Sequence, residues 1–310
     1  MKSVYIAGQS GASGLVLHEL VRQREDIRLL SREMQGRESL DRETELLNTA
    51  DVVILCLPLG VVHKTVERIT NLDVRVIDNS TAHSVAEDWV YGLPELNTAQ
   101  RDTIRQARRV SGPGCFATGV ILTLRPLVEW GIVDSSAPVC VQGIGGYSSG
   151  GKRMIEWYEQ PQGSPAPVVQ VFGLNLDHAQ VPEMQHHTGL QRPPLFVPWV
   201  GQFRQGTLVS IPLHRDWLKA GISPSSVRES LRDRYAQERL VCVRTRGLMS
   251  SISLPQAMGC EVELFVEGKD HLLLVARLDN LGKGSAVAAL QNMNLLLGCD
   301  EFAGISADQR

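Results

Sequence analysis

The segment SGPGCFATGVILTL, residues 111–124, places Cys115 behind two glycines and a proline, directly before an apolar run that predicts a helix. A thiol on the first turn of a helix lies near unpaired backbone N–H groups and the positive end of the helix dipole, and both favour the thiolate. Cys115 is therefore a candidate nucleophile. The alternative is a buried cysteine that packs as a small hydrophobic side chain, and this segment alone favours neither.

A glycine-rich turn near the N-terminus has the composition of a nucleotide-binding turn. The run SVYIAG predicts a short strand, and the following residues, GQSGASGLVLHELV, predict a turn that leads into a helix. Glycines in such a turn let the backbone approach a pyrophosphate, which then lies on the helix N-terminus. The glycine spacing is G-x-x-G-x-x-G, whereas the standard dinucleotide-binding motif is G-x-G-x-x-G. The alternative to nucleotide binding is therefore a turn whose glycines only allow the helix to pack closely on the sheet. The candidate cofactor-binding residues of this turn are Gly8, Ser10, Gly11 and Gly14.

The end of the second predicted strand, IRLL, indicates which dinucleotide is bound. An NAD-binding fold usually carries an acidic residue here for the ribose 2′-hydroxyl, whereas this sequence has Ser31 and Arg32. A serine and an arginine suit a 2′-phosphate. We therefore predict NADP(H) as the cofactor, with Arg32 as the phosphate partner rather than a solvated surface side chain.

Further apolar runs extend the predicted sheet. Residues 50–58 and 74–80 are typical of buried parallel strands. Ligands of open parallel sheets bind beyond the carboxyl ends of the strands, so we expect the loops with Pro58 and Ser80 to lie on the nicotinamide side of the cofactor. After Cys115 the pattern changes to glycine-rich segments and strand-like runs such as GTLVSIPLH and HLLLVARL. This change indicates a second, mixed α+β domain.

Composition and charge argue against several classes of protein. The 310 residues are 43% hydrophobic and 21% charged, which is typical of a folded protein long enough for two domains. A net charge of −3 gives no global attraction to nucleic acid or to an anionic membrane, and no stretch is long enough to span a membrane. The six cysteines include no Cys-x-x-Cys pair, which disfavours a zinc site or a disulfide framework. We therefore expect a cytoplasmic protein with no bound metal, no nucleic-acid partner and no membrane association.

Six segments, in this order, resemble the N-acetyl-gamma-glutamyl-phosphate reductase family, in particular its short form: VIDNSTAHSVAEDWVYGLPELN, SGPGCFATG, GGYSSGGK, GLNLDHAQVPEM, GQFRQGTLVSIPLH and LDNLGKGSAVAALQNMNLLLG. The resemblance implies an α/β fold of the aspartate-semialdehyde dehydrogenase type, in which a Rossmann-type nucleotide-binding domain carries an inserted α+β catalytic and dimerisation domain. The expected boundaries are residues 1–114 plus 283–310 for the NADP-binding domain and 115–282 for the catalytic domain. The resemblance also implies a homodimer or homotetramer.

The activity that the resemblance implies would explain the thiol. The family uses NADPH to reduce an acyl phosphate to an aldehyde in arginine biosynthesis. A thiolate at Cys115 would displace phosphate from the acyl phosphate and leave a thioester that accepts hydride. Two alternatives remain open: a related semialdehyde dehydrogenase acting on another acyl phosphate, such as an aspartyl phosphate, and a nucleotide-binding homologue without turnover.

A proton-transfer group is also required, and His178 is our choice. Family members commonly have H-x-H-x-P-E at this point, and here His178 occupies the first histidine position while Gln180 occupies the second. Glu183 is a candidate to orient a histidine or to bind substrate. His186 or His187 is a substitute candidate for the base, although such a pair is more typical of a polar loop or a helix end.

The remaining candidate site residues are two basic side chains and one asparagine. Lys152 in GIGGYSSGGKR and Arg204 in GQFRQGT are candidates to bind the phosphate or carboxylate of the substrate, and the sequence does not rank them. Asn280 lies in a two-glycine loop before a predicted amphipathic C-terminal helix, and the resemblance places this loop near the nicotinamide. The family usually has Asn-Pro-Gly-Cys-Tyr-Pro-Thr around the nucleophile and often a serine in the later glycine-rich segment. The chain departs from these patterns at Gly112, Phe116, Ala117 and Gly145.

Overall fold

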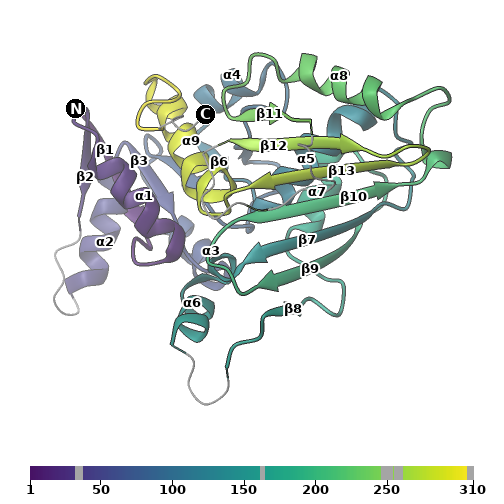
Figure 1. The fold of residues 1–310 in the computed structure, drawn as a ribbon. Helices are drawn as coiled ribbons and strands as arrows, with labels where there is room; N and C mark the ends of the chain where they lie inside the picture. Colours follow the sequence, from purple (N-terminus) through teal and green to yellow (C-terminus); the bar gives the residue numbers. More distant parts are fainter. Residues whose placement is uncertain (32–37, 161–164, 246–253, 255–260, 306–310) are drawn as a thin grey trace. The chain divides into compact units, whose positions relative to one another are not determined.

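The computed structural model describes residues 1–31, 38–160, 165–245, 254 and 261–305 (Figure 1). The chain divides into two compact units. Of the described residues, unit 1 comprises Met1–Gly114 and residues 285–305, and unit 2 comprises those within Cys115–Gly284. The chain therefore leaves unit 1 immediately before the candidate nucleophile. It returns at Ser285, whereas the sequence analysis placed the return at residue 283.

Unit 1 is built on a parallel sheet, which confirms the predicted Rossmann-type domain. In the described residues this sheet has six strands in the order β2-β1-β3-β4-β6-β5, and each neighbouring pair runs parallel. Strand β3 is buried along its whole length, which explains its uninterrupted apolar sequence. The strands are β1 (Lys2–Ala7), β2 (Ile27–Leu30), β3 (Val52–Leu55), β4 (Arg75–Asp78), β5 (Val90–Tyr91) and β6 (Arg109–Ser111).

The C-terminal helix of unit 1 differs from the prediction. Helix α9 (Val287–Leu297) packs against α1, α4, β3 and β4, and its residues are buried from Val287 through Leu296. The prediction of an amphipathic helix was wrong because the polar side chains find internal partners: the amide of Gln291 donates to Glu95, and that of Asn292 donates to the carbonyl of Gly92. The other helices of unit 1 are α1 (Ala12–Arg22), α2 (Glu38–Thr49), α3 (Leu59–Glu67) and α4 (Gln100–Gln106).

Unit 2 contains a mixed sheet, as the sequence predicted for the second domain. Its described strands follow the order β11-β12-β13-β10-β7-β9-β8, with parallel pairs at β11–β12 and β7–β9 and antiparallel pairs elsewhere. The strands are β7 (Cys140–Gly146), β8 (Val169–Val171), β9 (Leu195–Gly201), β10 (Thr207–Leu213), β11 (Val241–Val243), β12 (Val262–Glu267) and β13 (Leu272–Leu278).

Helix α5 (Cys115–Glu129) covers one face of this sheet and packs on β10, β12 and β13 (Figure 1). The approach is close at Gly119, where an added Cβ would lie 3.1 Å from Ala276 Cβ and 3.2 Å from Val209 Cγ2. The remaining helices of unit 2 are α6 (Gly151–Glu159), α7 (Val181–Thr188), α8 (Pro224–Arg234) and the short η1 (Tyr147–Gly150) and η2 (Arg215–Trp217), and the π-helical turn η3 (Gly282–Ala286) leads back into unit 1.

Candidate functional site

The glycine turn after β1 has a backbone that only glycine permits. Gly8 has a positive φ of 83°, and a Cβ added there would lie 2.2 Å from the carbonyl oxygen of Cys56. A Cβ on Gly14 would lie 2.3 Å from the carbonyl oxygen of Gly8. Gly11 caps α1 without a side-chain hydrogen bond to the first turn of the helix, and Ser10 is exposed in the same turn. Glycines therefore keep the turn open at an uncapped helix N-terminus, as binding of a pyrophosphate requires.

The other predicted cofactor contacts follow the same edge of the sheet. Strands β2, β1, β3 and β4 are parallel neighbours, so the residues after them lie along one carboxyl edge. Ser31 directly follows β2 and is exposed, Pro58 caps α3, and the Ser80 hydroxyl accepts a hydrogen bond from the backbone N–H of Ala82 at 3.2 Å. Arg32 lies outside the described residues.

A buried carboxylate and an imidazole at this edge were missed by the sequence analysis. Asp78, at the end of β4, is fully buried, and its two oxygens meet the backbone N–H of Ser80 at 3.0 Å and Nδ1 of His83 at 2.7 Å. The His83 ring stacks on Trp89 with ring centroids 4.1 Å apart. The pair fixes the loop that contains Ser80. The sequence signal that could have identified Asp78 is an acidic residue at the end of an apolar strand.

Cys115 is the first residue of α5 and is 9% exposed. Gly284 lies against it, because a Cβ added to Gly284 would be 2.7 Å from Cys115 Cβ. Gly112, which replaces the family's asparagine, donates its N–H to the carbonyl of Asp78 at 2.7 Å. A Cβ on Gly112 would lie 2.8 Å from Asn79 Oδ1, so a residue larger than glycine there requires the Asn79 side chain to move.

Burial controls the ionisation of the thiol. It raises the pKa of Cys115 to about 11, and the charge of Glu183 also raises it. The backbone N–H of Phe116 and the side chains of Thr207 and Gln180 lower the pKa of Cys115, but they do not compensate for burial. The sequence analysis considered only the local effects that favour the thiolate; burial acts against them and has the larger effect on the pKa of Cys115.

The structure places Gln180 and His178 in different surroundings near the start of α5. Gln180 caps α7, and its Oε1 accepts the backbone N–H of Ala117 at 2.9 Å. The His178 ring packs edge-on against Phe116 and Phe196, with ring centroids 6.0 and 5.0 Å away. Burial lowers the pKa of His178, so its ring is neutral near pH 7. Its Nδ1 accepts the backbone N–H of Gln180 at 3.2 Å, which leaves the proton on Nε2.

The remaining candidate residues of this segment, Glu183, His186 and His187, lie at opposite ends of helix α7. Glu183 is fully buried in the first turn, where its charge acts on Cys115. His186 and His187 lie in the last turn, with ring centroids 4.7 Å apart. The carbonyl of His187 accepts a hydrogen bond from Arg125 of α5 at 2.7 Å. The histidine pair therefore lies at the end of a helix.

The two candidate anion-binding cations lie at the surface beside α6. Lys152 Nζ is 3.8 Å from the carboxylate of Glu156, and its side chain is 67% exposed. Arg204 donates to Glu159 at 2.8 Å, and its side chain is also largely exposed. Both cations already have an acidic partner, so an anionic substrate would have to compete with that carboxylate.

Asn280 is buried and uses both ends of its amide within unit 2. Its Oδ1 accepts the backbone N–H of Gly206 at 2.7 Å, and its Nδ2 donates to the Ser148 hydroxyl at 2.9 Å. Asn280 therefore holds together the start of β10 and the glycine-rich segment before α6. Its predicted contact with the cofactor remains a prediction.

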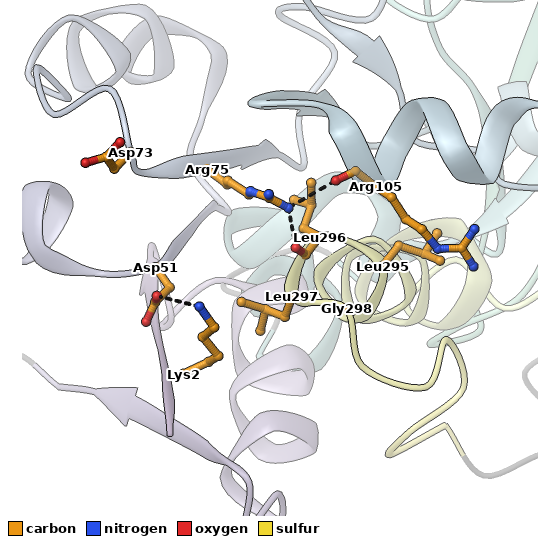
Figure 2. Close-up of a pocket in the computed structure, with 9 residues that line it drawn as sticks. All are labelled: Lys2, Asp51, Asp73, Arg75, Arg105, Leu295, Leu296, Leu297 and Gly298. Carbon is orange, nitrogen blue, oxygen red and sulfur yellow. Dashed lines mark hydrogen bonds and ion pairs between the residues drawn. The ribbon is translucent and has the colours of Figure 1, made fainter.

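A pocket of about 440 Å³ lies at the opposite, amino-terminal edge of the unit 1 sheet (Figure 2). Two of its polar side chains have partners within the pocket: Lys2 Nζ is 3.3 Å from Asp51, and Arg75 donates to the main-chain carbonyls of Arg105 and Leu296. These contacts tie the end of α9 to the sheet. The pocket is separate from the edge that carries the glycine turn, and we assign it a structural role.

Two kinds of feature are absent from the described part of the chain. It contains no cluster of three or more histidine, cysteine, aspartate or glutamate side chains arranged to hold a metal ion. None of its helices combines the length and the apolar character needed to cross a membrane.

Comparison with known proteins first gives the class. The family described as semialdehyde dehydrogenase, NAD binding domain, matches residues 3–107, and the family described as semialdehyde dehydrogenase, dimerisation domain, matches residues 115–280. The fold is similar to that of aspartate semialdehyde dehydrogenase II complexed with ASA from Vibrio cholerae, with a TM-score of 0.71 and 18% identity over 96% of this chain and 98% of that chain. Aspartate semialdehyde dehydrogenase with NADP from Candida albicans gives a TM-score of 0.65 and 14% identity over 96% and 98% of the two chains. The chain therefore has the fold and domain pair of the semialdehyde dehydrogenases.

Relatives with higher identity give the particular family. The chain is 42% identical over 305 residues to N-acetyl-gamma-glutamyl-phosphate reductase of Sinorhizobium medicae, covering 95% of this chain and 98% of the relative. It is 40% identical over 309 residues to N-acetyl-gamma-glutamyl-phosphate reductase 2 of Pseudomonas putida, and 39% identical over 317 residues to that of Nostoc sp., covering 97% and 98% in both cases. The chain belongs to the N-acetyl-gamma-glutamyl-phosphate reductase family, which confirms the resemblance found in the sequence.

Proposed function

We propose that this protein uses NADPH to reduce N-acetyl-gamma-glutamyl phosphate to N-acetylglutamate semialdehyde and phosphate in arginine biosynthesis. The observation that carries the proposal is Cys115, the first residue of α5, in a chain that aligns almost end to end with reductases of this name. We also propose a cytoplasmic location, because the mechanism requires Cys115 to stay reduced.

The cofactor is NADP(H), and unit 1 has the features that fit it. The turn of Gly8, Gly11 and Gly14 leaves room for a pyrophosphate at the start of α1. Ser31 and Arg32 follow β2, where a dinucleotide-binding fold contacts the 2′ position of the adenosine ribose, and neither is acidic. When bound, NADPH supplies the hydride that reduces the thioester.

Cys115 performs the covalent step. Its sulfur forms a bond to the acyl carbon, the bond between that carbon and the phosphate oxygen breaks, and phosphate leaves. The thioester accepts hydride, and collapse of the resulting hemithioacetal releases the aldehyde and regenerates the sulfur of Cys115.

His178 is our proposed proton donor for the developing oxyanion. Its ring is neutral near pH 7 because burial lowers its pKa, and Nε2 carries the proton because Nδ1 accepts the N–H of Gln180. Glu183, Lys152 and Arg204 remain proposed substrate-binding residues. The cations would exchange their α6 carboxylate partners for the substrate.

The oligomer is proposed to form through the sheet face of unit 2 that lies opposite α5. Ile144 on β7 pairs with Trp199 on β9 and with Leu208 on β10, so these side chains form a row on one face of the sheet. Val209, next to Leu208, faces α5, which places the row on the opposite side. Leu195 on β9 is 54% exposed and extends the apolar surface. This domain matches the dimerisation domain of the class, and we propose a homodimer.

Trp199→Asp should convert the dimer to monomers in sedimentation experiments, because a buried charge would replace an apolar contact. The matched control is Trp130→Asp, since Trp130 is similarly exposed but follows the end of α5. Equal sedimentation of both variants as dimers would exclude this face.

The activity is tested by NADP⁺ reduction in phosphate buffer with N-acetylglutamate semialdehyde or aspartate semialdehyde as the substrate. We expect turnover with the first and little with the second. Cys115→Ser should abolish turnover and leave NADPH binding intact, because the cofactor-binding turn lies in unit 1. Preference for aspartate semialdehyde, or turnover by Cys115→Ser, would overturn the proposed substrate or the thioester mechanism, respectively.

A further inference from the structure

The loop after β4, residues 79–82, lies between two buried ionisable side chains. Asp78, the last residue of β4, is fully buried, and His83, directly after the loop, is 8% exposed. The four residues between them are half-buried. The loop is therefore anchored at both ends, and its middle remains accessible.

One carboxylate joins the two ends of this loop. Nδ1 of His83 is 2.7 Å from one oxygen of Asp78, and the backbone N–H of Ser80 donates to the other oxygen at 3.0 Å. Because a carboxylate only accepts hydrogen bonds, Nδ1 carries the proton and donates it. Opening the pair would leave a buried charge without its partner, which is strongly unfavourable. The pair therefore stays closed.

The ring of His83 also connects the loop to helix α3. It stacks on the buried Trp89 with ring centroids 4.1 Å apart and an interplanar angle of 14°. It meets the ring of His63 edge-on, with centroids 4.9 Å apart. His63 belongs to α3, the helix capped by Pro58. His83 thus links the two segments that the sequence predicts on the nicotinamide side of the cofactor.

A second set of hydrogen bonds fixes the start of the loop. Nδ2 of Asn79 donates to the Ser285 hydroxyl at 2.9 Å, and that hydroxyl donates to the Ser13 hydroxyl at 2.7 Å. All three residues belong to unit 1, and Ser13 lies in the first turn of α1, directly after the glycine turn. The backbone N–H of Asn79 donates to the carbonyl of Leu55 at the end of β3. The loop is therefore tied to the helix that follows the glycine turn.

We propose that His83 and Ser285 are positioning residues for the nicotinamide half of NADP(H), which hold the loop of residues 79–82 in place before the cofactor binds. His83 acts through Asp78, and Ser285 acts through Asn79. Their role rests on the proposed use of NADPH and on the predicted place of this loop on the nicotinamide side. A loop that is already ordered loses little conformational freedom on binding, which raises affinity. The adenosine half depends on the glycine turn and the end of β2 instead.

Two ligands separate the halves of the cofactor: NADPH, and 2′-phospho-ADP-ribose, which lacks the nicotinamide. Calorimetric titration of the full chain measures both dissociation constants without substrate, so a wrong substrate assignment does not affect the result. The wild type should bind NADPH more tightly than 2′-phospho-ADP-ribose, by at least about threefold. Equal affinities would overturn the proposal, because the loop would then contribute nothing to binding of the nicotinamide.

Ser285→Ala tests the anchor at the start of the loop. It should weaken NADPH binding about three- to tenfold, since it removes one hydrogen bond to Asn79, and change 2′-phospho-ADP-ribose binding less than about twofold. The matched control is Ser3→Ala, because Ser3 is also a buried serine of unit 1 and its hydroxyl donates to Asp51 at 2.8 Å. This control should leave both affinities unchanged. Equal weakening of both ligands by Ser285→Ala would assign Ser285 to the glycine turn and overturn its proposed role.

Two substitutions of His83 separate its hydrogen bond from its ring. His83→Asn keeps an N–H at the place of Nδ1 and should bind NADPH within about threefold of the wild type. His83→Phe keeps a ring beside Trp89 but cannot donate to Asp78, and it should weaken NADPH binding at least about tenfold. Both should bind 2′-phospho-ADP-ribose within about twofold of the wild type.

Thermal unfolding shows first whether each variant folds. If His83→Phe does not fold, it is combined with Asp78→Asn, which leaves no buried charge without a partner. A purely structural role would lower the unfolding temperature and weaken both ligands alike. Such a result, or wild-type NADPH affinity in both Ser285→Ala and the His83→Phe protein, would refute the positioning role.

Discussion

Replacing Gly14 with alanine sets two opposing effects against each other in helix α1. In an ordinary helix interior, alanine is more favourable than glycine by about 1 kcal/mol. Here the new Cβ would lie 2.3 Å from the carbonyl oxygen of Gly8 and 2.9 Å from the Cα of Gln9. Both are backbone atoms of the turn, so no flexible side chain can move aside. Overpacking of this kind costs about 3 kcal/mol, and we expect a net loss of about 2 kcal/mol in the free energy of unfolding.

The matched control is Gly60→Ala in α3, at the same edge of the sheet. A Cβ on Gly60 would have no atom within 4 Å, so the change should be neutral or stabilise the protein by up to about 0.5 kcal/mol. Urea unfolding measures both free energies, and fluorescence titration measures NADPH binding. We expect Gly14→Ala to weaken NADPH binding at least about tenfold, because the turn must shift away from the pyrophosphate position, and Gly60→Ala to leave it unchanged. Normal stability and normal NADPH binding in Gly14→Ala would refute the reasoning.

Arg32→Asp should weaken NADPH binding at least about tenfold and spare NADH binding, because a charge-assisted contact to the 2′-phosphate is worth about 1.5–3 kcal/mol. Calorimetric titration measures the affinity for both cofactors. An equal loss of affinity for NADPH and NADH would argue that Arg32 supports the fold instead. His178→Asn should lower turnover about 10²–10⁴-fold with a smaller effect on cofactor affinity, and unchanged turnover would move the proton-donor role to another group. Asp78→Asn should lower the free energy of unfolding by about 3 kcal/mol, because it breaks the buried pair with His83. Its control, Asp88→Asn, removes an exposed ion pair and should cost less than about 1 kcal/mol in the same urea experiment, and similar losses in the two variants would show that burial does not strengthen the Asp78 pair.

The sequence alone predicted those parts of the site that depend on local backbone geometry. The glycine spacing after the first strand predicted the turn at the start of α1, and the glycine-proline segment before an apolar run predicted Cys115 at the start of a helix. Apolar runs of four or more residues predicted the buried parallel strands. These features are determined by neighbours along the chain, because backbone conformation and strand burial follow from short-range residue patterns.

Tertiary packing determined which side chains surround the start of α5. Segment 178–180 offered a histidine and a glutamine two residues apart. In the structure Gln180 bonds to the backbone of Ala117 in the first turn of α5, while His178 packs against Phe116 and Phe196. Thr207, which lowers the pKa of the Cys115 thiol, comes from a strand far along the chain. The thiol pKa likewise depends on burial, which no local pattern reports. Desolvation and hydrogen bonding depend on every group packed around an atom, and for Cys115 these groups come from three separate segments that only the folded unit 2 brings together.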